Sequence, residues 1–159
     1  MLGAGAVKYF VFPPPVQFAE AGEKTPDTFR DQMAFFANER FALDKFYKEL
    51  GDSQQWLEAK DFPVFDAVPS KIVGFRGMGC KKIDWDGTKV GLVCFKNGAG
   101  QVVHLFVMDA EDLVGVESPA TPLQEMAVMR GLETGGWIEG DKVMLLVGSD
   151  PDVPIGEFL

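Results

Sequence analysis

The stretch GCKKIDWDGTKVGLVCFKNGAGQVVHLFVMD, residues 79–109, is predicted to form three consecutive antiparallel strands. Asp86-Gly87 is a hairpin signal between two segments of alternating apolar residues, and Asn97-Gly98 followed by Gly100 is a second one. Both cysteines, the single histidine and one of the three tryptophans lie in this stretch. The rest of the chain is therefore expected to pack around this β-meander.

Two helices are expected before the meander. Thr25 is placed as an N-cap with Pro26 at the first helical position, and apolar residues follow at i, i+4 and i+7. This pattern predicts a helix over residues 26–37. A second helix is predicted over residues 53–60. The segment between them, 38–50, fits neither the helix nor the strand period, so it either continues the first helix or crosses the surface as an extended link.

The regions flanking the meander on its two sides give weaker signals. Residues 71–75 are predicted to form a short edge strand ahead of it. Residues 122–130 resemble a short capped helix, although 128–133 equally suits the start of a strand. Residues 135–147 are predicted to form a final hairpin with a Gly140-Asp141 turn, and residues 150–159 a short terminal helix or tail.

These elements predict an α+β fold. Strands outnumber helices and are joined by tight turns, so we expect an antiparallel β-meander of about five strands with the two N-terminal helices packed on one face. We expect residues 1–15 to be an apolar N-terminal segment or the end of a membrane anchor, 16–25 to be a linker, and 26–159 to form a single domain.

Composition excludes some classes of function. The formal net charge is −9 and the basic residues are scattered. This argues against a nucleic-acid partner, because binding a nucleic-acid phosphate backbone needs a concentrated basic surface. The two cysteines and the one histidine do not have the spacing of metal ligands. The glycine-rich segments are followed by predicted strands, whereas a phosphate-binding loop is followed by a helix. We therefore expect no metal and no cofactor.

Cys80 and Cys94 lie on neighbouring predicted strands and form a candidate disulfide or thiol pair. If the first turn contains four residues, Cys80 lies opposite Phe95, on the face of the sheet away from Cys94. Side chains on opposite faces point apart, so this register favours two buried free thiols. A one-residue β-bulge would reverse that and favour a disulfide.

His104 is a candidate general base for a nucleophilic cysteine. If the second loop lets Lys96 pair with Gln101, His104 falls on the same face as Cys80 but is separated from it by other side chains. No Asp or Asn is placed to orient the imidazole. This arrangement favours a structural histidine in or beside the core over catalysis, and we expect that the chain is not an enzyme.

The N-terminal segment Met1–Phe12 is apolar apart from Lys8 and is followed by three prolines, which end any helix. Its length falls short of the roughly 20 apolar residues that span a bilayer. The aromatic residues just before a proline-rich exit are typical of a membrane–water interface. We therefore expect this segment to be the distal end of a membrane anchor, with a buried or frayed N-terminus as the alternative.

Several short motifs, taken together, resemble a known family. They are Trp56-Leu57, Gly79-Cys80, Asp84-Trp85-Asp86-Gly87, Val93-Cys94-Phe95, His104-Leu105-Phe106-Val107, Gly136-Trp137 and Val143–Gly148. This pattern resembles the extracytoplasmic part of bacterial single-pass membrane proteins of the anti-sigma-factor type, in which a transmembrane helix precedes a small α+β domain. The chain lacks the sigma-binding region and the zinc-binding His/Cys motif of that family. The resemblance implies membrane anchoring, an extracytoplasmic (periplasmic) location and a regulatory role.

The sequence therefore predicts a non-enzymatic extracytoplasmic sensor or regulatory domain, attached to a membrane through its N-terminus. Another protein is a possible partner, because an open sheet face with aromatic and Met residues can bind one. The alternatives are a small soluble ligand-binding domain and a thiol-dependent enzyme that uses Cys80 and His104.

Overall fold

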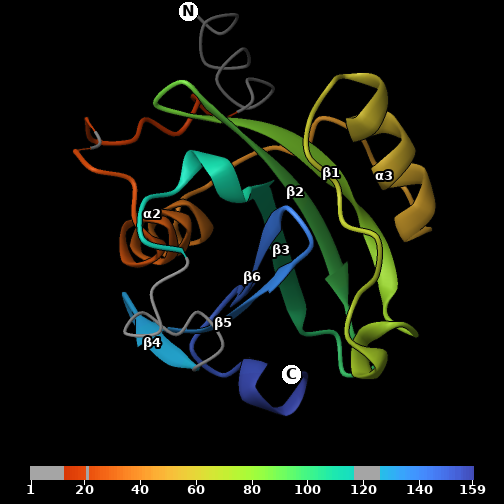
Figure 1. Cartoon of the computed structure of the whole chain (residues 1–159). Coiled ribbons are helices and arrows are strands. Elements are labelled where there is room, and N and C mark those ends of the chain that lie inside the picture. The colour runs from red at the N-terminus through yellow and green to blue at the C-terminus, as the bar shows by residue number, and fades with distance from the viewer. Residues whose placement is uncertain (1–12, 21, 117–125) are drawn as a thin grey trace, which may run out of the picture.

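A computed structural model describes residues 13–20, 22–116 and 126–159 of the chain. In these residues a six-stranded antiparallel sheet, in the order β1-β2-β3-β6-β5-β4, packs with two α-helices (Figure 1). The strands are β1 (Arg76–Trp85), β2 (Thr88–Lys96), β3 (Val102–Asp109), β4 (Ala127–Met129), β5 (Leu132–Glu139) and β6 (Lys142–Gly148). The predicted α+β class with an antiparallel sheet is confirmed.

The strand order shows that the sheet consists of two three-stranded units. β1, β2 and β3 follow one another as the predicted meander, and β4, β5 and β6 form a second one. The two units join where β3 pairs antiparallel with β6. The last strand of each unit therefore lies in the centre of the sheet, which explains why the residues of β3 and β6 are almost all buried.

The first helix, α2 (Pro26–Asn38), begins where the sequence predicts. The Thr25 side chain accepts a hydrogen bond from the Thr28 backbone N–H, and the Thr28 hydroxyl accepts one from the Thr25 backbone. This reciprocal pair satisfies two donors that a helix start leaves unpaired. The second helix, α3 (Leu50–Ala59), begins three residues earlier than predicted.

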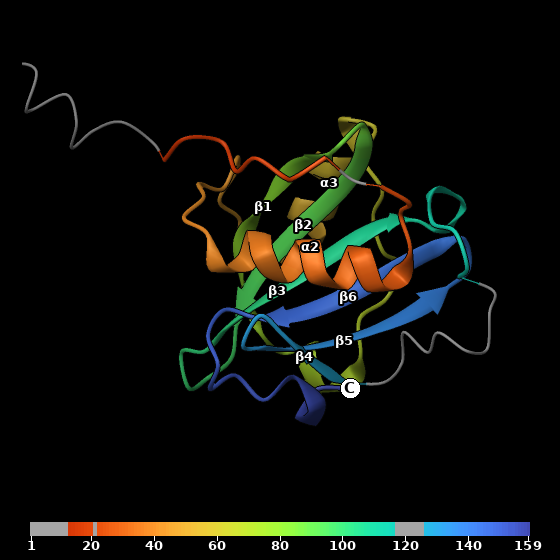
Figure 2. The same ribbon diagram turned by 90° about the vertical axis from the view of Figure 1, so that its left-hand side faces the viewer.

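The two helices cover opposite faces of the sheet, so the predicted packing on one face is wrong (Figures 1 and 2). The α2 side contains Phe29, Met33, Phe36, Ile83, Trp85, Val90, Leu92, Cys94 and Phe106. The α3 side contains Leu57, Cys80, Val93, Phe95, Val103, Leu105 and Val107. Alternate residues of β2 and β3 belong to different clusters, because both sheet faces are buried and both need apolar side chains.

The first hairpin has a two-residue turn. Asp86 and Gly87 both have positive φ, 47° and 86°, and Trp85 pairs with Thr88. This is the geometry that an Asp-Gly dipeptide favours between twisted strands. The four-residue turn 86–89 considered from the sequence is two residues too long at its C-terminal end, which shifts the register by two. A shift of two preserves side-chain direction, so the predicted faces of Cys80 and Cys94 hold.

The segment before β1 is not the predicted edge strand at 71–75. It forms a short 3₁₀-helix, η1 (Ser70–Ile72), and the chain becomes extended only at Arg76. The edge of β1 is instead covered by the extended link between the helices. Cys80 N–H donates to the Lys45 carbonyl at 2.9 Å, and Lys45 N–H donates back at 3.2 Å.

The C-terminal third agrees with the predicted hairpin, in which β5 and β6 are joined through Gly140-Asp141. The possible helix at 122–130 lies partly outside the described residues, and residues 127–129 are the strand β4. Two further 3₁₀-helices are present, η2 (Ala110–Asp112) and η3 (Ile155–Glu157). The last of these is the only helical turn described in the C-terminal tail.

Residues 1–12, the bulk of the predicted anchor, lie outside the described residues. The segment that follows contacts the domain directly. Val16 and Phe18 pack against the α2-side core, and the Phe18 ring stacks on Phe36 with centroids 5.8 Å apart. The Lys24 ammonium donates to Thr88 Oγ1. In the part of the chain that the structure describes, no helix is long and apolar enough to cross a bilayer.

Candidate functional site

The loop between β2 and β3 determines which cysteine meets the histidine. Lys96 pairs with Val102, one residue later than the sequence predicts, so Cys94 lies directly opposite His104. A shift of one residue exchanges the two faces of a strand. His104 is therefore on the face of Cys94, and the predicted sharing of a face with Cys80 is wrong.

Cys94 and His104 form a direct contact, with 3.0 Å between Sγ and Nδ1. The pair is enclosed: the cysteine is 2% exposed and the histidine 6%. Phe41 and Phe106 border the imidazole, with ring centroids at 5.5 Å and 6.3 Å. The surroundings are aromatic, and no carboxylate hydrogen bond to the ring is found among the described residues.

Burial decides the protonation states of this pair. Desolvation raises the pKa of the Cys94 thiol, with the charge of Cys80 adding to it, and desolvation lowers the pKa of His104 to about 4. Both groups are therefore neutral at pH 7. A nucleophilic cysteine needs a thiolate beside an imidazolium, with room for a substrate. The contact is instead a neutral sulfur–imidazole hydrogen bond inside the core.

Cys80 lies on the other face of the sheet and is fully buried. Desolvation raises the pKa of its thiol, and a hydrogen bond from Ser53 opposes this only in part. Both cysteines are free thiols in the structure. The residues singled out from the sequence are thus separated into a Cys94–His104 pair and an isolated Cys80.

The buried histidine predicts a loss of stability in mild acid. Its pKa is lower in the folded state than the ordinary value near 6.5, so the unfolded chain binds its proton more tightly. Stability is then present above pH 6.5 and is lost as the pH falls toward 4. Linkage gives a loss of about 2 kcal/mol in the free energy of unfolding between pH 7 and pH 5.

Urea denaturation at a series of pH values measures this effect, with His104→Leu as the matched variant. The variant removes the titrating ring, so its stability is expected to be nearly constant between pH 7 and pH 5, above the range in which most carboxylates titrate. Equal pH slopes for the two proteins in that window would contradict a buried neutral histidine.

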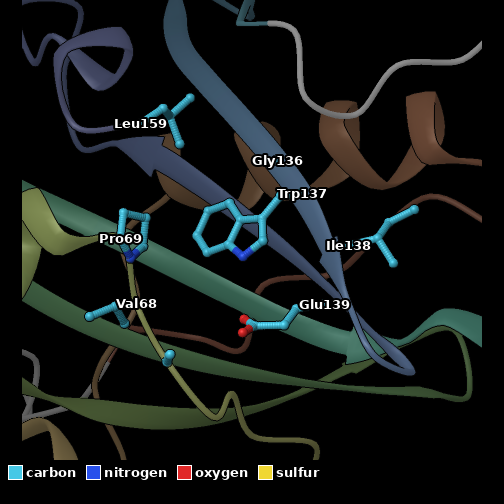
Figure 3. Close-up of a pocket in the computed structure, with 8 residues that line it drawn as sticks. Val68, Pro69, Gly136, Trp137, Ile138, Glu139 and Leu159 are labelled. Carbon is cyan, nitrogen blue, oxygen red and sulfur yellow. The ribbon is translucent and has the colours of Figure 1, made fainter.

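A different site lies on the surface at β5. A pocket of about 490 Å³ is formed there by the loop after α3, by the end of β5 and by the C-terminal tail. Its lining is mostly apolar: Ala67, Val68, Pro69, Gly136, Trp137, Ile138 and Leu159, with Glu139 as the one charged side chain. Figure 3 shows the half-buried Trp137 ring in the middle of this group.

The pocket adjoins a strand edge. β6 pairs with β5 on one side, and on the other side β4 pairs only with Leu132–Thr134. On that second side, no strand among the described residues lies beside positions 135–139 of β5. Ile138 is 41% exposed in this stretch. A strand with one free edge beside an apolar pocket can bind an extended chain through both its backbone and its side chains.

Sequence reasoning missed this pocket, although it allowed for a partner on an open sheet face with aromatic residues. The signal in the sequence is Gly135-Gly136 before Trp137, since the lack of a Cβ at Gly135 admits the Leu159 side chain, which lines the pocket. The lining from residues 67–69 and 159 is distant in sequence and depends on the tertiary fold.

No group of three or more His, Cys, Asp or Glu side chains within the described ranges is arranged to hold a metal ion. Comparisons of the chain with protein-family models, with curated proteins and with solved structures find no match.

Proposed function

We propose that this chain is a non-enzymatic sensor or regulatory domain, held on the extracytoplasmic side of a membrane through its N-terminus. The observation that carries the regulatory part is the apolar pocket beside the unpaired edge of β5. An extended segment of another protein could add to that edge and place an apolar side chain against Trp137. The resemblance to anti-sigma-factor-type membrane proteins supports the location.

The rival is a thiol-dependent enzyme, and the contact between Cys94 and His104 favours it. Such an enzyme needs a substrate to reach the sulfur. Both groups are inside the core, and the pKa of each is shifted toward its neutral form. The pocket at β5, by contrast, is open at the surface and contains no cysteine or histidine. A binding role therefore uses the accessible features of the molecule, and the enzymatic role does not.

Thiol reactivity distinguishes the two functions. In the native protein at pH 7, Cys80 and Cys94 are expected to react with iodoacetamide at least about a hundredfold more slowly than in denaturant, because both are buried thiols with raised pKa. Peptide mass analysis after timed labelling assigns each rate, and Cys94→Ser and Cys80→Ser identify the residue. Rapid alkylation of either native thiol would support the enzyme instead, and a mass lower by two hydrogens would show a disulfide.

Truncation tests the proposed anchor. Removing residues 1–15 is expected to change the free energy of unfolding by less than about 0.5 kcal/mol, because Val16 is the first described residue that packs against the core. Removing residues 1–20 is expected to cost about 1–2 kcal/mol more, because it also deletes Phe18, which stacks on Phe36.

Vesicle co-sedimentation provides the membrane readout for the same proteins. The intact chain is expected to sediment with phospholipid vesicles, and the chain without residues 1–15 to remain in solution. Equal sedimentation of both, or unfolding on removal of residues 1–15, would show that the segment does not act as an anchor.

A further inference from the structure

A second surface pocket lies at the opposite end of the sheet, where β1 begins and β2 ends. It encloses about 360 Å³. Its side chains are of two kinds: the cationic Lys48, Arg76 and Lys96, and the apolar or aromatic Phe46, Tyr47 and Met78. We propose that this pocket binds a phosphate monoester that carries an aromatic or other apolar substituent.

The link between the helices builds one wall of the pocket. Gly77 N–H donates to the Lys48 carbonyl at 2.9 Å, and Tyr47 N–H donates to the Met78 carbonyl at 3.3 Å. Gly77 permits this approach, because a Cβ there would lie 2.7 Å from the Lys48 carbonyl oxygen. The close contact brings Lys48 to the start of β1, next to Arg76.

The other two cations lie opposite each other on neighbouring strands. Arg76 of β1 is directly opposite Lys96 of β2. Like charges at directly opposed positions of an antiparallel pair are destabilising. The protein has 24 acidic and 15 basic residues, so carboxylates are in excess elsewhere. An anion bound between Arg76 and Lys96 would offset this repulsion, which explains why two like charges are paired in an otherwise acidic protein.

The contrast with other basic side chains strengthens the argument. Lys81, Lys89, Arg130 and Lys142 each form an ion pair with an aspartate. In the described part of the chain, no acidic side chain lines the pocket or forms an ion pair with its three cations. The charges of the pocket are therefore uncompensated within the described protein and available to a ligand.

The chemistry of the lining selects the kind of anion. A phosphate monoester carries about −1.5 to −2 charge at pH 7 and offers three strong acceptor oxygens. An arginine fork can bind two of these oxygens, and lysine ammonium groups supply further charge. Phe46 is 75% exposed beside the cations, although it is a large apolar side chain. Together with Tyr47 it provides a surface on which an apolar substituent can pack.

Titration of the full chain with phenyl phosphate tests the proposal, by isothermal calorimetry at fixed low ionic strength. Saturable binding at one site is expected. Arg76→Gln and Lys96→Gln should each weaken it by at least about tenfold, since each removes a charge-assisted hydrogen bond. Lys60→Gln is the matched control, because it removes one exposed lysine charge outside the pocket and should change affinity by less than about twofold.

Two further measurements, the affinity for inorganic phosphate and the melting temperature without ligand, test separate parts of the proposal. Inorganic phosphate is expected to bind more weakly than phenyl phosphate, and equal affinities would overturn the role of Phe46 and Tyr47. Without ligand, Lys96→Gln should melt at a higher temperature than the parent protein, because it removes the repulsion from Arg76. No saturable binding, or an equal loss for Lys60→Gln and Arg76→Gln, would overturn the site. None of these outcomes depends on the pocket at β5 or on the membrane anchor.

Discussion

Replacing Trp85 by alanine is expected to lower the free energy of unfolding by about 3–5 kcal/mol, the usual cost of emptying a large aromatic site in a core. Trp85 is fully buried at the end of β1 and packs against Phe29 of α2, with ring centroids 5.7 Å apart. The Lys24 ammonium lies 5.4 Å from the same ring. The substitution therefore loosens the first helix, the first hairpin and the segment before α2 together.

Urea denaturation of Trp85→Ala and Trp85→Phe separates packing from polar effects. The indole Nε1 is buried without a hydrogen-bond partner among the described residues. Phenylalanine removes that unsatisfied donor and keeps most of the ring volume, so its cost should be clearly smaller than that of alanine. A loss below about 1 kcal/mol for the alanine variant would show that this corner of the core is not packed as described.

Replacing Gly79 by alanine is expected to cost more than about 3 kcal/mol, because the change combines backbone strain with a backbone clash. Gly79 follows the irregularity in β1 and has φ of 152°, a value that residues with a Cβ rarely adopt. An added Cβ would overlap the Lys45 carbonyl oxygen. The link would have to separate from β1, which breaks its reciprocal hydrogen bonds with Cys80.

The control for this substitution is Gly98→Ala. Gly98 lies in the β2–β3 loop, and a Cβ there meets no atom within 4 Å. Its change should stay within about 0.5 kcal/mol. Hydrogen exchange adds a local readout, since the Cys80 amide should lose protection in Gly79→Ala and keep it in Gly98→Ala. Similar denaturation midpoints for both variants would contradict the close approach of the link to β1.

The two hairpin turns show what the sequence of the meander could and could not predict. Both turns were located correctly from their Gly-containing dipeptides, and both predicted registers were wrong. The error at Asp86-Gly87 was two residues and left every side chain on its predicted face. The error at the Asn97 loop was one residue and moved His104 from the face of Cys80 to that of Cys94. Loop length, which local sequence determines poorly, therefore decided the candidate site.

The placement of the helices needed information that local patterns do not contain. The apolar stripe of α2 predicts a buried face but not the sheet face it covers. β2 has apolar residues on both faces, as in its buried run Val90–Phe95, and such a strand requires cover on both sides. That continuous run was the available signal that the helices would separate. The cationic pocket was equally hidden, because Arg76 and Lys96 meet only through strand pairing and Lys48 joins them only through the link.

The link that covers β1 also limits how copies of this domain can associate. Hydrogen bonds from the link between the helices occupy the first half of that edge. Lys81 and Lys82 follow in the strand, and lysine side chains on an edge discourage strand pairing between molecules. At the other end of the sheet, among the described residues, backbone is left unpaired along the outer side of β4 and beside positions 135–139 of β5. A domain whose sheet can pair at one end alone can pair with one other copy of itself. Edge-to-edge association would therefore stop at a closed two-fold dimer and could not extend into a fibre.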